Sequence, residues 1–303
     1  MEEPLFTVIV PATTANVGPG YDSVGMALSL YMTVHVTEAS EWNVHYDGEE
    51  YVGLPADDTN LIVRTIKDVA ERYGKEVHPH ALHIVSDIPL GKGLGSSATA
   101  IAAGIEIANE LLDLSLTPQE KVLIGSENEG HADNVVAALL GGVTVAYFVE
   151  NELELIQLPQ PVIGVVILVP PNALKTSESR GLLPRELPHS VAAAGNAASN
   201  VMLTAITLGD WKLAGKMMEK DIFHEQYRKP LLHDFDQVRK VCHELGAYGM
   251  TISGAGPSLF VAVKEGIQEE IAKNLEMEFP HYKAIAITPS PIGSTIKKTP
   301  ASQ

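Results

Sequence analysis

A glycine-rich turn between an apolar strand and a long helix is the feature that most constrains this chain. Residues 89–99 read Pro-Leu-Gly-Lys-Gly-Leu-Gly-Ser-Ser-Ala-Thr, after a strand-like segment at 81–85 and before an alanine-rich, helix-like segment at 98–112. Glycine lets the backbone approach a ligand without an intervening Cβ. A helix that begins after such a turn directs free N–H groups and its positive dipole end toward it. The sequence therefore predicts an anion site, above all for phosphate.

The turn differs from two common phosphate-binding motifs. Gly95 is followed by Ser96, whereas a Walker A loop ends in Gly-Lys-Ser/Thr. The glycine spacing also fits the dinucleotide-binding fingerprint poorly. Because a glycine-rich turn can be a tight connection and nothing more, the choice depends on other motifs.

Two further stretches place small and polar residues between apolar segments. Residues 10–22 read Val-Pro-Ala-Thr-Thr-Ala-Asn-Val-Gly-Pro-Gly-Tyr-Asp and follow a short strand-like run. Residues 251–260 read Thr-Ile-Ser-Gly-Ala-Gly-Pro-Ser-Leu-Phe. Turn-forming residues alone would make the first a surface loop, but a mere connection rarely needs so many polar side chains. We expect both stretches to contribute to a site, the second through Gly254 and Gly256.

Charge and composition limit the possible partners. The chain has 303 residues, enough for a buried core in one large or two modest domains, and a formal net charge of −17. This charge argues against nucleic acid and anionic membrane surfaces as partners. Residues 1–150 carry 6 Lys and Arg against 22 Asp and Glu. An anion site in that half must therefore depend mainly on backbone N–H groups and metal ions.

The chain also predicts a cytoplasmic location. The single cysteine, Cys242, excludes an intrachain disulfide. The first residues, Met-Glu-Glu-Pro, lack the basic and apolar regions of a signal peptide. We find no apolar run long enough to span a bilayer.

Strand-like and helix-like segments follow one another without strict alternation, which favours an α+β fold. We expect a helix at 60–73, another that begins after Thr117 with a capping box, and a hairpin about Asn151. The predicted division is an N-terminal domain at 1–159 and a C-terminal domain at 160–303. We expect the polar tail, 290–303, to be partly mobile.

Together, the motifs resemble the GHMP kinase superfamily, which includes galactokinase and mevalonate kinase. The Pro-Ala-Thr-Thr-Ala-Asn-x-Gly-Pro-Gly-Tyr-Asp motif, and Glu-Gly-His-Ala-Asp-Asn at 129–134, are most similar to the homoserine kinase family. The resemblance implies an N-terminal domain like domain 2 of ribosomal protein S5, a ferredoxin-like C-terminal domain and an active site between them. It also implies ATP and L-homoserine as substrates, Mg²⁺ as cofactor, a role in threonine biosynthesis and a homodimer.

The resemblance assigns nucleotide binding to the glycine-rich turn, which consists of Pro89, Leu90, Gly91, Lys92, Gly93, Leu94, Gly95, Ser96, Ser97, Ala98 and Thr99. Ser97 is expected to help bind Mg²⁺, and Lys92 either contacts phosphate or is a solvated loop lysine. Related kinases hold Mg²⁺ with a glutamate that precedes the His-Ala-Asp-Asn segment. Glu127 and Glu129 are the candidates, and the pattern favours Glu127; the alternative for either is an exposed helix carboxylate.

The acceptor is expected to be a small zwitterion with a primary hydroxyl. Arginine is the usual bidentate partner of a carboxylate. Arg180 and Arg228 lie in segments that resemble those holding the substrate carboxylate in homoserine kinases. The ammonium group needs acceptors, for which Asn16 and Asp22 are suited, with His131 nearby in its own motif.

The general base is the least constrained assignment. A resemblance to mevalonate kinases would imply a catalytic aspartate paired with a lysine of the first motif, but here this motif has Thr13 and Thr14 and no lysine. Asp133 falls near the corresponding aspartate; the alternative is a path in which the hydroxyl proton passes to the departing phosphoryl group. The catalytic candidates are thus Asp22, Asp133 and Ser97. Another small-molecule GHMP kinase and a catalytically silent sensor remain the competing hypotheses.

Overall fold

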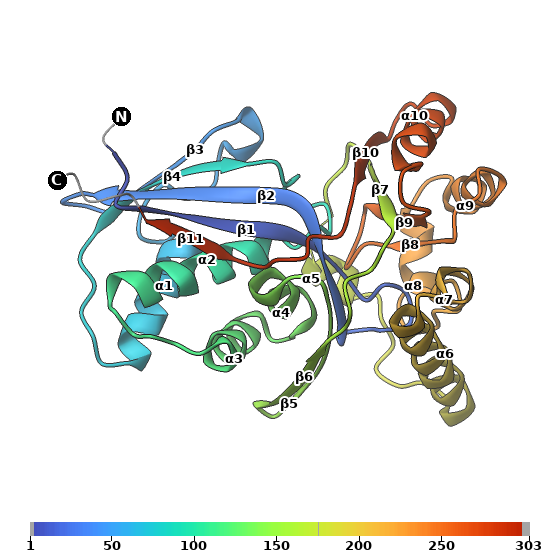
Figure 1. The fold of residues 1–303 in the computed structure, drawn as a ribbon, viewed down its shortest axis with the longest axis horizontal. Coiled ribbons are helices and arrows are strands. Elements are labelled where there is room, and N and C mark those ends of the chain that lie inside the picture. Colours follow the sequence, from blue (N-terminus) through green and yellow to red (C-terminus); the bar gives the residue numbers. More distant parts are fainter. Residues whose placement is uncertain (1–2, 175, 299–303) are drawn as a thin grey trace.

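Two β-sheets, each covered by helices, form the two lobes of the molecule (Figure 1). The computed structural model describes residues 3–174 and 176–298. The larger sheet has the strand order β11-β1-β2-β4-β3, and β5 pairs with both β2 and β6. Its strands are β1 (Phe6–Ala15), β2 (Val24–Glu38), β3 (Asn43–Tyr46), β4 (His80–Ser86), β5 (Val143–Val149), β6 (Glu152–Gln157) and β11 (Thr295–Lys298). The smaller sheet has the order β10-β7-β9-β8, with β7 (Gly164–Val169), β8 (Gly249–Ile252), β9 (Leu259–Val263) and β10 (Lys283–Ile287).

The first four α-helices lie together on one side of the larger sheet (Figure 1). They are α1 (Leu61–Arg72), α2 (Ser96–Leu111), α3 (Pro118–Glu129) and α4 (Asp133–Leu140), preceded by the short η1 (Glu49–Tyr51). The predicted capping box is confirmed, because Thr117 accepts from the Glu120 N–H while the Glu120 carboxylate accepts from the Thr117 N–H. The α2 helix is apolar on nearly every side, which is typical of a helix buried between a sheet and other helices.

The remaining helices lie at the end of the molecule beyond the smaller sheet, except for α5, which lies near the junction of the lobes (Figure 1). They are α5 (Thr176–Arg180), α6 (His189–Leu208), α7 (Trp211–Met218), α8 (Glu225–Arg228), η2 (Lys229–Leu231), α9 (Phe235–Glu244) and α10 (Gln268–Glu278). Alternate residues of β7 belong to two apolar clusters: Val165 and Ile167 join the main core, whereas Val166 and Leu168 join the cluster beneath α9 and α10. The smaller sheet is therefore buried on both faces.

The first polar motif begins inside a strand, contrary to the loop expected from 10 onward. The β1 strand continues to Ala15 and pairs with β2 along its length, with a register shift after Pro11. Thr13 and Thr14 are fully buried. Because backbone pairing holds this half of the motif in the sheet, only residues 16–23 remain for the turn.

The C-terminal tail is also more ordered than expected. Thr295–Lys298 forms β11, which pairs antiparallel with Phe6–Ile9 of β1 and so covers an edge of the larger sheet. Residues 299–303 lie outside the described residues. The domain division at 159/160 stays a prediction. In the structure, the last strand, β11, crosses back to the larger sheet of the first lobe.

The α6 helix has the length and mean hydropathy, 1.3, that a membrane-crossing helix requires, the only one among the described residues to do so. The expectation that no segment reaches this length was therefore wrong. Its many alanines raise the mean hydropathy, although Asn196 and Asn200 interrupt the run. One such helix is weak evidence for a membrane span, because core helices of soluble proteins share this composition.

Candidate active site

A pocket at the junction of the two lobes brings the predicted motifs together. It is lined by Ala15, Asn16, Tyr21, Asp22, Gly91, Gly93, Gly95, Ser96, Ser97, Glu129, His131, Asp133, Asn134, Leu174, Arg180, Arg228, Gly254 and Ala255. These residues come from both lobes and from segments more than 200 positions apart. Their convergence is therefore a property of the tertiary fold.

The glycine-rich turn has the backbone that its sequence predicts. Gly91, Gly93 and Gly95 all have positive φ, and Gly95 precedes the first turn of α2. A Cβ on Gly95 would lie 1.9 Å from Thr13 Oγ1, and one on Gly93 would lie 2.3 Å from the Ser253 carbonyl oxygen. The two glycines thus let the turn pack directly against β1 and against the β8–β9 connection.

The turn residues divide into three groups. Gly91, Gly93, Gly95, Ser96 and Ser97 line the pocket, as does Gly254 from the β8–β9 connection. Leu90 and Thr99 line a second, adjoining pocket. The remaining turn residues line neither pocket: Leu94 and Ala98 are buried in the core, and Pro89 and Lys92 lie outside both linings. Gly256, in the β8–β9 connection, also lies outside both linings.

The Lys92 side chain contacts the backbone of the other lobe. Its ammonium donates to the carbonyl oxygens of Pro170 at 2.9 Å and Pro171 at 2.7 Å, which lie just after β7. Burial lowers the Lys92 pKa. Since this lysine ties the turn to the smaller sheet, the backbone carries the positive character of the pocket at this end.

The adjoining pocket was not anticipated from the sequence. It is largely apolar and is lined by Met32, Tyr46, Tyr51, Leu54, Pro55, Asn60, Leu61, Ser86, Ile88, Leu90, Ser96, Ser97, Thr99 and Ala100. The rings of Tyr46 and Tyr51 stack with centroids 5.3 Å apart. Ser96 and Ser97 belong to both linings, so the two pockets meet at the start of α2. No single motif marks this pocket, because its residues come from several separate segments.

The two candidate glutamates of α3 point in different directions. Glu129 lines the pocket, where its carboxylate accepts a hydrogen bond from Ser97 Oγ at 3.1 Å. Burial raises the Glu129 pKa, and the nearby His131 and the Ser97 hydroxyl partly offset this shift. Glu127 instead forms an ion pair with Arg72 at the end of α1 and is absent from the lining. The structure thus places Glu129, and not the preferred Glu127, in the pocket, because two residues along a helix correspond to a rotation of about 200°.

His131 and Asp133 form a buried pair at the start of α4. His131 Nδ1 lies 2.7 Å from Asp133 Oδ1, which also accepts from the Asn134 backbone N–H at 2.7 Å and from Asn134 Nδ2 at 3.3 Å. Burial lowers the His131 pKa, but the hydrogen bond and the charge of Asp133 outweigh it and the net pKa is raised. Asn134 Oδ1 in turn accepts from Thr13 Oγ1 at 2.8 Å.

Arg180 and Asp22 meet directly across the pocket. The guanidinium donates to both carboxylate oxygens of Asp22, at 2.7 and 3.0 Å, and to the Tyr21 hydroxyl at 3.1 Å. Burial lowers the Arg180 pKa, but its bonds to Asp22 outweigh this effect and raise it. The two residues were expected to contact opposite ends of a zwitterion; the structure shows them also bound to each other.

Arg228 is buried more deeply and has fewer partners. Only 2% of its surface is exposed, and Nη1 donates to the Gly254 carbonyl oxygen at 2.9 Å. Its Nε has no hydrogen-bond partner among the described residues. Burial lowers the Arg228 pKa, while the nearby Tyr21 and Asp22 oppose that shift. A buried guanidinium with unused donors is well placed for an anionic ligand.

The turn that carries Asn16 and Asp22 is backbone-strained and firmly held. Asn16, Val17 and Asp22 have φ values of 68°, 51° and 54°, a region that β-branched residues such as valine rarely adopt. The Asn16 side chain donates to the Gly254 carbonyl at 3.0 Å and accepts from the Asp22 N–H at 3.0 Å. From the other lobe, His224 Nε2 donates to the Gly18 carbonyl at 3.1 Å.

Comparisons with known proteins agree with this architecture. Residues 60–142 match the family of GHMP kinases N terminal domains, and residues 202–281 match the GHMP kinases C terminal family. A homoserine kinase of Bacillus velezensis is 42% identical over 301 residues, which are 99% of this chain and 97% of that protein. One from Bacillus cereus is 46% identical over 279 residues, 92% of each chain.

A solved structure gives the same result. The crystal structure of homoserine kinase from Cytophaga hutchinsonii superimposes with a TM-score of 0.85 at 27% identity, covering 98% of both chains. The two-domain α+β architecture expected from the motifs is thereby confirmed. Sequence identity above 40% over nearly the full length, together with this superposition, places the chain in the homoserine kinase family of the GHMP kinases.

Proposed function

We propose that this protein transfers the γ-phosphoryl group of ATP to the hydroxyl of L-homoserine, giving ADP and O-phospho-L-homoserine. One observation carries the proposal: a single pocket joins the glycine-rich start of α2 to two arginines, Arg180 and Arg228. The end of the pocket at the start of α2 suits a polyphosphate, and the end with the two arginines suits a small carboxylate. Phosphoryl transfer depends mainly on placing such groups and balancing their charge.

The nucleotide is proposed to bind across both pockets. The N–H groups of Ser96 and Ser97, at the positive end of α2, face its phosphates. The adjoining apolar pocket, with the stacked rings of Tyr46 and Tyr51, accepts the adenine base. Because the two serines line both pockets, the base and the phosphates can be held at the same time.

Glu129 and Ser97 fit a magnesium site. Both offer oxygen, the ligand that Mg²⁺ prefers, and they already lie 3.1 Å apart. The Glu129 side chain is 13% exposed, and its one ion-pair contact among the described residues is His131 Nε2 at 4.0 Å, so a bound cation would add to the balance of its charge. When bound, Mg²⁺ would neutralise charge on the nucleotide phosphates. We therefore assign the metal role to Glu129 instead of Glu127.

Two arginines and an aspartate set the local charge around the proposed carboxylate contact. Arg180 and Arg228 contribute two positive charges, and Asp22 offsets one by its bidentate pair with Arg180. We propose that Arg228 provides the main contact to the homoserine carboxylate and that Arg180 completes it. Asp22 and the Asn16 side chain, which share the strained turn, accept from the ammonium group. Asp22 thus serves to hold substrate and Arg180, and not as a base.

We propose that Asp133 positions His131 toward the substrate and takes no proton itself. Its Oδ1 is already occupied by three donors, from His131 and Asn134. These bonds hold the carboxylate in place, and we propose the path in which the hydroxyl proton passes to the transferred phosphoryl group without a protein base.

An ADP-release assay with a panel of hydroxyl acceptors tests the proposal. L-Homoserine should give the highest kcat/KM, and mevalonate, shikimate and galactose should give little turnover. 3-Aminopropan-1-ol, which lacks the carboxylate, should be a poor acceptor. A better acceptor from the panel would replace homoserine in the proposal. Absence of turnover with every acceptor would support a silent sensor that only binds the nucleotide.

We further infer that the protein is a cytoplasmic homodimer that binds neither nucleic acid nor membranes, on the family resemblance and its net charge of −17. Light scattering coupled to size-exclusion chromatography tests the dimer. A mass near 32.5 kDa, that of one chain, would contradict it.

A further inference from the structure

Three histidines form a row across adjacent strands of the larger sheet. In the strand registers, His35 of β2 is the partner of His83 of β4, and His83 is the partner of His45 of β3. Direct cross-strand partners project from the same face of a sheet. Their sequence neighbours point the other way and are buried in the core: Val34, Val36, Val44, Leu82 and Ile84. The row therefore lies on the face opposite the core.

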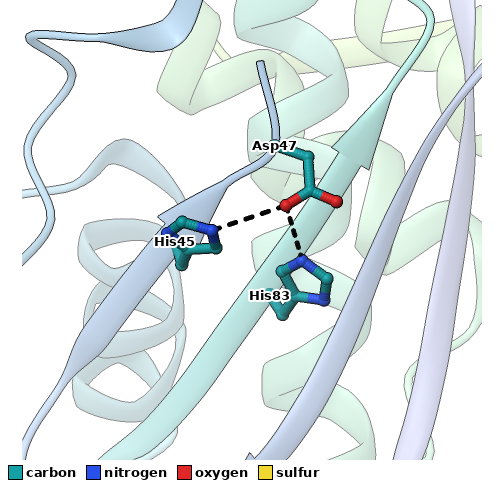
Figure 2. A group of neighbouring side chains, drawn as sticks. All are labelled: His45, Asp47 and His83. Atoms are coloured by element: carbon teal, nitrogen blue, oxygen red, sulfur yellow. Dashed lines mark hydrogen bonds and ion pairs between the residues drawn. The ribbon is translucent and has the colours of Figure 1, made fainter. Parts of the chain in front are cut away.

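Asp47 completes a compact cluster with two of these histidines. It comes directly after β3, two positions beyond His45, and its backbone N–H still donates to the Ile84 carbonyl of β4. Its Oδ1 lies 2.9 Å from His83 Nε2 and 3.4 Å from His45 Nε2, and both rings point toward it (Figure 2). The three potential ligand atoms all lie within 4.8 Å of one another. They are already directed at a common point.

The His83 ring is fixed from both sides. It stacks on His45 with ring centroids 5.5 Å apart and on His35 with centroids 5.8 Å apart. The His35 ring is held in turn by a 3.0 Å hydrogen bond between its Nδ1 and Thr7 Oγ1. A chelating group whose rotamer is already restrained loses less entropy when it binds an ion.

The donor set selects a class of ion. Two imidazole nitrogens and one carboxylate oxygen suit Zn²⁺ and neighbouring divalent transition metals, whereas Mg²⁺ and Ca²⁺ prefer oxygen ligands alone. Three protein ligands leave a fourth tetrahedral position for water. The His45 side chain is 70% exposed and that of Asp47 is 49% exposed, so an ion can reach them from solvent.

We propose that His45, Asp47 and His83 bind one zinc-class divalent ion on the outer face of the larger sheet. None of the three lines the active-site pocket, so this site is separate from the magnesium site assigned to Glu129 and Ser97. The ion joins β3 to β4. The β3 strand has four residues and lies at the edge of the sheet, and β4 is its one strand partner among the described residues, so a metal link would strengthen the attachment of a short edge strand.

Calorimetric titration of the metal-free protein with Zn²⁺ tests the site. We expect one ion per chain whose affinity falls at least tenfold in H83Q and in H45Q. His45 is largely exposed, so H45Q should leave the fold intact even if H83Q disturbs it. The matched control is H281Q, because His281 also faces a carboxylate, Asp234 at 3.6 Å, but belongs to no three-ligand group among the residues that the structure describes. Its zinc affinity should equal that of the unchanged protein.

Two further readouts separate this site from binding in the pocket. Co²⁺ in place of Zn²⁺ should give visible absorption that H83Q and H45Q abolish. Hydrogen exchange of the β3 amides should slow on adding Zn²⁺. Zinc binding that is unchanged in both variants would place the ion elsewhere and overturn the proposal, as would the absence of zinc binding by the unchanged protein.

Discussion

Replacing Arg228 with methionine is the sharpest test of how this pocket selects its acceptor. Methionine roughly preserves the length of the side chain and removes its charge and donors. Arg228 uses Nη1 on the Gly254 carbonyl, and its Nε has no partner among the described residues. The Gly254 carbonyl also accepts from Asn16 Nδ2. The substitution therefore removes the free donors without leaving that carbonyl unpaired.

The expected size of the effect follows from the bond that is lost. A hydrogen bond to a charged group contributes about 1.5–3 kcal/mol. At about 1.4 kcal/mol per factor of ten, the loss of one such bond lowers kcat/KM for homoserine by roughly 10- to 150-fold. A second bond to the same carboxylate would increase the loss. The KM for ATP should change little, because the nucleotide is held at the other end of the pocket.

A coupled ADP-release assay measures this effect for L-homoserine and for 3-aminopropan-1-ol. Arg228→Met should lower kcat/KM strongly for L-homoserine and only slightly for 3-aminopropan-1-ol, so that the preference for the acceptor with a carboxylate falls. The control is Lys229→Met: Lys229 is the adjacent residue, pairs with Asp236 and lies outside the pocket lining. Unchanged discrimination in a folded Arg228→Met protein would refute the carboxylate contact and reopen the identity of the acceptor.

Three further changes test other parts of the structure. Glu129→Gln should lower activity at limiting Mg²⁺, with partial recovery at high Mg²⁺. Its control, Glu127→Gln, loses only a surface ion pair and should leave the kinetics unchanged. The reverse pattern would make Glu127 the metal ligand. Gly95→Ala should abolish Mg-ATP binding in calorimetry, because its Cβ would lie 1.9 Å from Thr13 Oγ1. The control is Gly74→Ala, which has a similar positive φ but open space around the Cβ, and which should only cost about 1 kcal/mol of stability. Normal Mg-ATP binding by Gly95→Ala would show that the turn can move to accept the methyl group. His224 is fully buried, and burial lowers its pKa to about 3 from 6.5, so the unfolded chain takes up a proton that the folded protein does not, and stability is lost as pH falls below 6.5. Urea unfolding should show that this residue costs about 2 kcal/mol of stability between pH 7 and pH 5. The His224→Gln variant should lack this loss; an equal loss in the variant would assign the effect to other groups.

The sequence by itself determined the features that depend on local backbone geometry. Glycines at 91, 93 and 95 predict a turn with positive φ, and all three adopt it. Thr117 and Glu120 predict a helix start, and the capping box forms there. Such features need only a few consecutive residues. The order of the motifs along the chain was likewise enough to indicate the family and the two-domain fold.

Only the tertiary structure decided which side chains meet. Glu127 and Glu129 were both candidates along the chain, with Glu127 favoured, but the rotation of α3 directs Glu127 to Arg72 and Glu129 to Ser97. Lys92 lies in the middle of the glycine-rich turn, yet the position of the second lobe gives it two carbonyl partners there. Such outcomes depend on how helices and sheets are rotated and docked, which no short pattern records.

The same reason explains why the apolar pocket and the histidine cluster were missed. Tyr46 and Ser97 line one pocket although about 50 positions separate them, and His45 meets His83 through strand register. The parallel pairing of β3 with β4 places these residues, and adjacent β3 residues face opposite sides of the sheet. Tyr46 therefore lines the apolar pocket, while His45 and Asp47 face the other side. A one-residue change in register would reverse this arrangement, so the pairing of strands, and not their composition, decides it.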